Sequence, residues 1–213
     1  MDYYSDLLCI WAYIAQARVD EIKKQFGEQV QVNYRVCKVF ADSSYKMETT
    51  WKAKGDYEGF ADHLHEVAKQ YDHIQLHEDI WRKTRPVSST PAHLTLKAVQ
   101  QVAPDKCVQT MIALREAFFI EARDISSSAV LEQILEQVGV SVDQVNALIS
   151  CGQAHVLLEA DMRDKELQNI SGSPTYVLND GRQKLYGNVG YGVIEANIKE
   201  LLKSSHMGAA SWC

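Results

Sequence analysis

Cys9 is the residue of this sequence best placed for chemistry. It follows the aromatic segment 2–8 and precedes a helical apolar stripe that runs from Ile10 to Phe26 and stops at Gly27. At the start of a helix, free backbone N–H groups and the helix dipole favour a negative charge. Such positions lower the pKa of a thiol from about 8.5 to values between about 3.5 and 7.5. We therefore expect an exposed thiol at Cys9 with a lowered pKa, because the thiolate is the nucleophilic form.

The other four cysteines carry weaker signals. The five cysteines include no C-x-x-C pair and no Cys/His cluster with zinc spacing, so no metal site and no disulfide framework is predicted. Cys37 ends the alternating segment 30–37, so a core role is expected for it. Cys107 and Cys151 lie in or beside helical stretches, and a structural role is expected for both. Cys213 is the last residue and is either incidental or able to reach Cys9.

Composition excludes several classes of protein. The 213 residues include 22 Lys and Arg against 28 Asp and Glu, a formal net charge of −6, with 46% hydrophobic residues. This balance is that of a globular domain, and the acidic net charge disfavours binding to nucleic acid. No apolar run reaches the roughly 18 residues of a membrane span, and segment 1–6 lacks the features of a secretory signal. We expect a cytoplasmic protein, and a homodimer remains open because no pattern specifies an interface.

The order of predicted elements indicates an α/β fold. Segments 2–8 and 30–37 are predicted strands around the first helix, which makes a βαβ unit. Near the C-terminus, segments 174–178 and 183–186 are predicted strands joined by the Asn179-Asp180-Gly181 turn, and a last helix follows. The intervening residues have few strand signals.

Five helix starts are predicted in the middle of the chain. Four of them are marked by capping hydroxyls, carboxylates or a first-turn proline, at Ser88-Ser89-Thr90-Pro91, Pro104-Asp105, 124–128 and Ser141. The fifth predicted helix spans 153–169. The expected organisation is therefore one α/β domain made of 1–55 and 169–203, an all-helical insertion at 56–168, and a flexible tail at 204–213.

Several short motifs, in this order, resemble one known family. They are Leu8-Cys9-Ile10-Trp11-Ala12-Tyr13, Ala117-Phe118-Phe119 with Asp124-Ile125, Gly172-Ser173-Pro174-Thr175-Tyr176, and the hairpin from Gly181 to Gly187. Together with the element order, they resemble the thioredoxin fold with a helical insertion. The resemblance is closest to the DsbA-like family, which includes FrnE-type proteins, 2-hydroxychromene-2-carboxylate isomerases and kappa-class glutathione transferases.

The resemblance implies a thiol–disulfide oxidoreductase in which Cys9 is the nucleophile. Trp11 would help to wall the site. Family members have a cis-proline at the position of Pro174, facing the active cysteine. The backbone of Ser173, just before it, would pair with an extended thiol substrate as an added strand does, with Thr175 completing the substrate-binding segment.

The motif departs from the family pattern at two of its four positions. The oxidoreductases carry Cys-Pro-Trp-Cys or a similar pair, whereas this chain has Cys9-Ile10-Trp11-Ala12. With Ala12 in place of the resolving cysteine, Cys9 cannot form the usual internal disulfide. It would either form mixed disulfides with glutathione or a protein, or use Cys37 or Cys213 as a remote partner.

Two further functions remain open from the sequence. One is a glutathione-dependent isomerase or transferase in which Cys9 replaces the serine of those relatives. They hold glutathione with a Ser-Asp pair, and the nearest match here, Asn188-Val189, lacks the acid. The other is a peptide-binding module without catalysis. No tightly bound cofactor is predicted, and glutathione is expected at most as a co-substrate.

Overall fold

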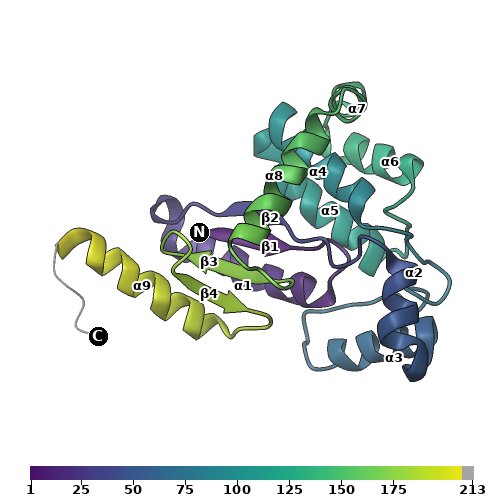
Figure 1. The fold of residues 1–213 in the computed structure, drawn as a ribbon, viewed down its shortest axis with the longest axis horizontal. Coiled ribbons are helices and arrows are strands. Elements are labelled where there is room, and N and C mark those ends of the chain that lie inside the picture. The colour runs from purple at the N-terminus through teal and green to yellow at the C-terminus, as the bar shows by residue number, and fades with distance from the viewer. Residues whose placement is uncertain (208–213) are drawn as a thin grey trace.

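A four-stranded mixed sheet forms the centre of the computed structural model, which describes residues 1–207 (Figure 1). The strand order is β2-β1-β3-β4. β1 (Asp2–Ser5) pairs in parallel with β2 (Asn33–Val36) and antiparallel with β3 (Thr175–Leu178), which pairs antiparallel with β4 (Gln183–Tyr186). The predicted thioredoxin-like α/β fold with a helical insertion is therefore confirmed.

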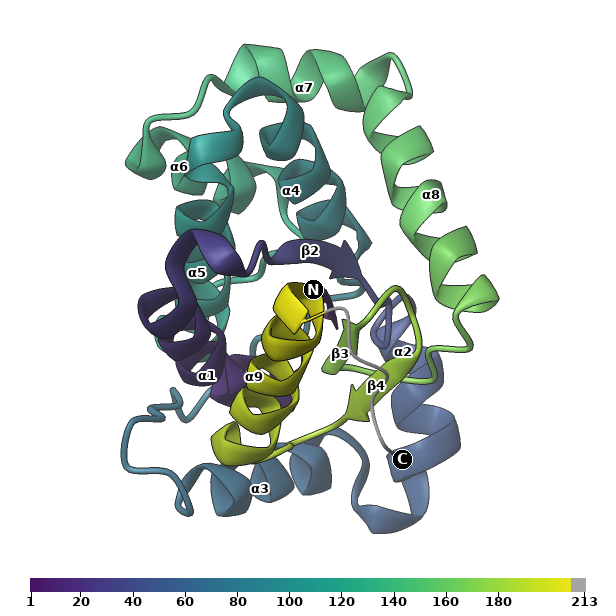
Figure 2. The same cartoon turned by 90° about the vertical axis from the view of Figure 1, so that its left-hand side faces the viewer.

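The side chains of the two central strands, β1 and β3, point alternately to the two faces of the sheet, and both faces are buried. Tyr3 and Tyr176 pack against α1 (Ile10–Phe26) and α9 (Tyr191–Met207). The next residues, Tyr4 and Val177, face the opposite side, because successive side chains of a strand point to opposite faces. Figure 2 shows α1 and α9 together on one side of the sheet and α8 on the other.

Helices fill the middle of the chain. In order, they are α2 (Ser43–Lys46), a π-helical turn (Met47–Trp51), a 3-10 turn (Lys52–Lys54), α3 (Asp56–Ala68), α4 (Thr90–Val102), a 3-10 turn (Pro104–Lys106), α5 (Cys107–Phe119), α6 (Ser128–Val138), α7 (Val142–Ser150) and α8 (Gln153–Leu167). A further 3-10 turn, Gly27–Gln29, follows α1. The five helices predicted after Ser88 are all present. Ser141 caps α7 as expected, its Oγ accepting the N–H of Gln144 at 3.4 Å.

Element boundaries differ from the expectations at three places. β1 ends at Ser5 rather than near residue 8, because the Asp6 carboxylate accepts the N–H of Leu8 at 2.9 Å and turns the chain. Helical structure begins at Ser43, before the expected start of the insertion at 56. α9 continues to Met207, so 204–207 belong to a helix and not to the expected flexible tail. The rest of that tail, including Cys213, lies outside the described residues.

The insertion is joined to the edge of the sheet by buried polar contacts. On α8, Asp161 accepts the N–H of Val36 in β2 at 2.9 Å and pairs with Lys97 of α4. Gln100 of α4 donates to the carbonyl oxygen of Tyr34 at 3.2 Å. These groups cover backbone positions that an edge strand would otherwise expose. α4 is thereby fixed to the sheet, with its first turn near the β1–α1 junction.

Candidate active site

The β1–α1 junction holds Cys9 as the residue that caps α1. Its backbone is extended, with φ −82° and ψ 115°, and its carbonyl oxygen accepts the N–H groups of Ala12 and Tyr13 at 3.0 Å. Its own N–H donates to the carbonyl oxygen of Asp6 at 3.2 Å. The sulfur thus stands at the N-terminus of the helix, where free N–H groups favour an anion.

The loop before β3 meets this sulfur. The Cys9 thiol donates to the carbonyl oxygen of Ser173 at 3.3 Å, and the Ser173–Pro174 peptide bond is cis. The carbonyl oxygen of Pro174 accepts the N–H of Gly187 at 2.8 Å, which ties the loop to the end of β4. Residues more than 160 positions apart in sequence, Cys9 and Ser173, are therefore in direct contact.

The expectation of an exposed thiol with a lowered pKa is wrong for this conformation. Cys9 is only 7% exposed, and burial raises the pKa of its thiol above the ordinary value. The side chain of Ser173 and the N–H groups of Ala12 and Trp11 act in the opposite direction, whereas the charge of Asp6 adds to the rise. The helix N-terminus is present as expected, but desolvation outweighs it. In this arrangement the thiol is protonated at neutral pH.

The remaining motif residues have different environments. Ile10 and Ala12 are buried, and the carbonyl oxygen of Ala12 accepts the hydroxyl of Tyr3 at 3.3 Å. Trp11 is half-buried, so it is the motif residue that reaches the surface beside Cys9. The position of the family's resolving cysteine therefore lies inside the core and carries a methyl group.

The expected substrate-binding segment is mostly buried in this structure. Ser173 is 9% exposed, and its Oγ accepts the N–H of Asp6 at 2.8 Å. Thr175 is buried, donates its hydroxyl to the carbonyl oxygen of Gly172 at 2.7 Å, and lies between Tyr4 and Tyr186 in the sheet register. Both sides of Thr175 are thus occupied by neighbouring strands, and a substrate role for Ser173 and Pro174 stays a prediction.

The candidate resolving thiols are not bonded to Cys9. Cys9 and Cys37 are both free, and Cys37 packs with Tyr4 and Val177 in a separate apolar cluster. Burial raises the pKa of Cys37 to about 11. Cys213 lies outside the described residues. A remote resolving role for either thiol stays a prediction.

Three polar residues near Cys9 were not predicted from the sequence as part of the site: Asp6, Ser89 and His93. Asp6 is fully buried and accepts the hydroxyl of Ser89 at 2.9 Å, and Nε2 of His93 lies 3.7 Å from its Oδ1. Ser89 was considered only as a helix cap, and His93 appears as one polar residue in an apolar run. The available signal was Asp6 itself, a carboxylate three residues before Cys9 and followed by two leucines.

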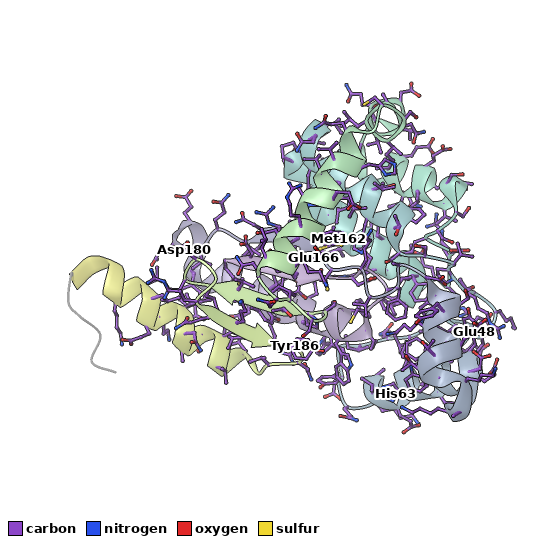
Figure 3. All side chains as sticks on the ribbon, viewed as in Figure 1. Glu48, His63, Met162, Glu166, Asp180 and Tyr186 are labelled. Atoms are coloured by element: carbon purple, nitrogen blue, oxygen red, sulfur yellow. The ribbon has the colours of Figure 1, made fainter. Side chains whose placement is uncertain are left out.

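An exposed aromatic ring lies beside the loop that contains Pro174. Tyr186 is 63% exposed at the end of β4 that points toward α3 (Figure 3). Its ring rests on Gly172, where a Cβ atom would lie 2.8 Å from it. The absence of a side chain at Gly172 thus lets the ring cover the start of this loop.

Residues 1–207 contain no group of three or more His, Cys, Asp and Glu side chains that could hold a metal ion. In the same part of the chain, no helix has both the length and the apolar character needed to cross a membrane.

Comparison with known families gives the class of this protein. The DSBA-like thioredoxin domain family matches residues 1–199, so the chain belongs to that family. A search of curated proteins found no match.

Solved structures of similar fold agree with the family. A probable DsbA oxidoreductase from Streptomyces coelicolor aligns with a TM-score of 0.77 at 17% identity, covering 100% of this chain and 92% of the other. The cytosolic disulfide reductase DsbM from Pseudomonas aeruginosa aligns with a TM-score of 0.68 at 17% identity and 98% coverage of both chains. A 2-hydroxychromene-2-carboxylate isomerase also gives 0.68, at 15% identity and 98% coverage of both. At these identities the likeness concerns the fold.

Proposed function

We propose that this member of the family is a thiol–disulfide oxidoreductase that acts through Cys9 as its single nucleophile. The observation that carries the proposal is the contact between the Cys9 thiol and the Ser173 carbonyl oxygen at the N-terminus of α1. It brings together a helix-capping sulfur and a backbone segment able to align a substrate. No second thiol follows one turn later, because Ala12 occupies that position.

The proposed reaction is two successive thiol–disulfide exchanges. The Cys9 thiolate attacks one sulfur of a substrate disulfide, forms a mixed disulfide and releases the other substrate sulfur as a thiolate. Glutathione, as its thiolate, then attacks the substrate sulfur of the mixed disulfide, and Cys9 leaves as a thiolate. The net change is a disulfide plus glutathione giving a thiol plus a glutathione mixed disulfide, with no change in the oxidation state of Cys9.

Substrate binding explains how a buried thiol becomes reactive. The Ser173 carbonyl oxygen accepts the Cys9 thiol in the resting protein. A substrate strand that pairs with Ser173 would take this carbonyl for its own N–H group, as in β-augmentation. The thiol then loses its acceptor, and the N–H groups at the start of α1 are left to stabilise the thiolate. Trp11, two residues after Cys9, and Tyr186, whose ring rests on Gly172, are both accessible to solvent and are available to a substrate bound at this segment.

Glutathione is the proposed co-substrate, acting in a reducing cytosol. Support comes from a relative, the cytosolic reductase DsbM, which has also been solved with glutathione at 15% identity and a TM-score of 0.65. We propose no tightly bound cofactor and no metal.

Reduction of a model disulfide by glutathione tests the proposal. The parent should accelerate the reduction, Cys9→Ala should fall to the uncatalysed rate, and Cys107→Ser should match the parent. Cys107 is a suitable control because it is a second buried cysteine at a helix start, away from Ser173. Equal rates for the parent and Cys9→Ala would overturn the proposal.

The burial of Cys9 and the raised pKa of its thiol favour a second candidate, a peptide-binding module without catalysis. In that case an extended peptide pairs with the backbone at Ser173 whether or not Cys9 is modified. Alkylation of Cys9 should then leave peptide affinity unchanged, as measured by calorimetry. A complete loss of affinity would reject this candidate.

A function as a glutathione-dependent isomerase or transferase has less structural support. Asn188, the nearest match to the pair that holds glutathione in those relatives, donates its side-chain amide to the hydroxyl of Tyr71. This alternative predicts saturable glutathione binding even in Cys9→Ser. A calorimetric titration with glutathione that shows no heat of binding in either protein would reject it.

A further inference from the structure

The carboxylate of Asp6 is held by four hydrogen-bond donors from three segments. Oδ1 accepts the N–H of Leu8 at 2.9 Å, and Oδ2 accepts the N–H groups of Val39 at 2.7 Å and Phe40 at 2.9 Å. The hydroxyl of Ser89, just before α4, completes the set at 2.9 Å. One side chain thus connects the β1–α1 junction, the segment after β2 and the helical insertion.

The surroundings of Asp6 favour the charged form of its carboxyl group. Burial disfavours its ionisation, but the neighbouring His93 imidazole and the N–H groups of Phe40 and Leu8 hold the pKa of the carboxyl below its ordinary value. His93 is itself only 2% exposed, and its Nε2 lies 3.7 Å from Oδ1 of Asp6 and 3.4 Å from the backbone nitrogen of Leu7. A buried carboxylate with this many donors keeps its charge.

The backbone of Asp6 contacts both partners of the Cys9 hydrogen bond. Its carbonyl oxygen accepts the N–H of Cys9 at 3.2 Å, and its N–H donates to Oγ of Ser173 at 2.8 Å. Cys9 and Ser173 are in turn joined by the thiol contact at 3.3 Å. The three residues form a closed ring of contacts, so Asp6 is bonded to both the residue that carries the sulfur and the residue that carries its acceptor.

Asp6 also supplies the fixed negative charge near this sulfur. Titratable groups that interact with Cys9 or with Asp6 include Tyr3, Cys37 and His93. Burial raises the pKa of Tyr3 well above its usual range and that of Cys37 to about 11, so both are neutral at physiological pH. A neighbouring negative charge disfavours a thiolate.

We propose that Asp6 is a positioning residue for the thiol chemistry: its carboxylate holds Cys9 as a protonated thiol against the Ser173 carbonyl oxygen until a substrate displaces that contact. The inference rests on the proposed function, because it assigns a resting state to the same sulfur. It implies that an unoccupied site resists alkylation, and that reactivity is released by a disulfide substrate, oxidised glutathione included, that pairs with Ser173.

The pH dependence of Cys9 alkylation tests this proposal. The full chain is treated with iodoacetamide between about pH 6 and pH 10, and modification is measured on the tryptic peptide from Met1 to Arg18, which contains Cys9 as its only cysteine. In Asp6→Asn the midpoint should fall by about one pH unit, so that Cys9 reacts about tenfold faster near neutral pH. An unchanged midpoint in the folded variant would overturn the proposal.

Two matched variants separate charge from loosening of the loops. Ser89→Ala removes one donor to Asp6 but keeps the carboxylate, and His93→Gln keeps the carboxylate but removes the imidazole. In both variants, the pH midpoint of Cys9 alkylation should equal or exceed that of the parent. A midpoint lowered equally in Ser89→Ala would attribute the effect to loosening and contradict the proposal.

Two further measurements cover the case in which Asp6→Asn does not fold. Asp6→Ser is also neutral, and its hydroxyl can still accept the N–H of Leu8. In the parent itself, the proposal requires a midpoint above the roughly 8.5 of a free cysteine, and a lower midpoint would overturn it without any variant.

The test is independent of the proposed function. If Cys9 fails to exchange with oxidised glutathione while the midpoint still falls in Asp6→Asn, the oxidoreductase proposal fails and the role of Asp6 stands. If Cys9 exchanges with oxidised glutathione but the alkylation midpoint is unchanged in Asp6→Asn, the proposed role of Asp6 fails and the oxidoreductase proposal stands.

Discussion

Two cysteines in this protein stand at the start of a helix, and their surroundings differ. Cys9 caps α1 and Cys107 begins α5; they are 7% and 6% exposed, and burial raises the pKa of both thiols. Around Cys107, a hydrogen bond from Gln100 and the charges of Lys97 and Lys23 oppose this rise. Around Cys9, the charge of Asp6 adds to it.

By the sign of the neighbouring charges alone, Cys107 has the more favourable surroundings for a thiolate. What Cys9 has and Cys107 lacks is the Ser173–Pro174 segment, whose carbonyl oxygen lies 3.3 Å from the sulfur. A helix N-terminus therefore does not define the site. The proposed chemistry therefore depends on the backbone that faces the sulfur, and variants of the residues around the two thiols test this difference.

The largest expected effect is a change of product in Ala12→Cys. This variant places a second thiol one turn after Cys9, in the family's arrangement. We expect oxidised glutathione to produce an internal disulfide in place of a stable glutathione adduct, because the nearby thiol displaces glutathione. Intact mass distinguishes the two products. A stable adduct on Cys9 in this variant would show that the buried position 12 cannot reach it.

Lys97→Met is expected to lower the stability of the fold strongly and to leave the alkylation midpoint of Cys9 unchanged. Lys97 pairs with the buried carboxylate of Asp161, and removing one partner of a buried pair costs about 3 kcal/mol of unfolding free energy. The loss of its charge should also raise the pKa of Cys107 further. Urea unfolding and alkylation of the tryptic peptide from Cys107 to Arg115 measure both effects. An altered alkylation midpoint for Cys9 would contradict the separation of the two thiols.

A moderate effect is expected for Tyr186→Ala. The exposed ring beside Gly172 offers an aromatic surface to a peptide substrate, worth about 1 kcal/mol or roughly fivefold in affinity. KM for a peptide disulfide should rise, while the rate with oxidised glutathione stays constant. Equal losses with both substrates would place the ring outside the peptide contact.

The smallest effect is expected for Cys107→Ser. Because Cys107 lacks the facing Ser173–Pro174 segment, the rate of disulfide reduction by glutathione should match that of the parent. A rate lowered to that of Cys9→Ala would erase the difference between the two thiols.

The sequence predicted the fold well because its signals are local. The alternation of residues 174–178, the Asn179-Asp180-Gly181 turn and the capping hydroxyl of Ser141 each specify the structure of a few residues, and the described elements follow them. The extension of α9 to Met207 was missed because the polar residues Ser204 to His206 resemble a tail as much as an exposed helix end.

The site was only partly predictable. The motifs around Cys9 and Pro174 predicted that these two segments meet, because they resemble motifs of a known family. Their spacing in the sequence alone did not predict the contact. The burial of Cys9 was not predictable, because desolvation depends on how separate segments pack. Asp6 and His93 were missed for the same reason: their 3.7 Å separation joins residues 87 positions apart.

The role of Cys9 as a single nucleophile is tested by mass spectrometry after brief exposure to oxidised glutathione, with the parent and Cys9→Ser compared. We expect a glutathione adduct on the parent that is absent from Cys9→Ser, which establishes Cys9 as a reactive single thiol; any adduct on the exposed Cys151 should be equal in the two proteins. The absence of a Cys9-dependent adduct would contradict the proposed mechanism and leave the peptide-binding module. The loss of two hydrogens without an adduct, dependent on Cys9, would contradict the single-nucleophile mechanism by revealing a resolving cysteine elsewhere in the chain.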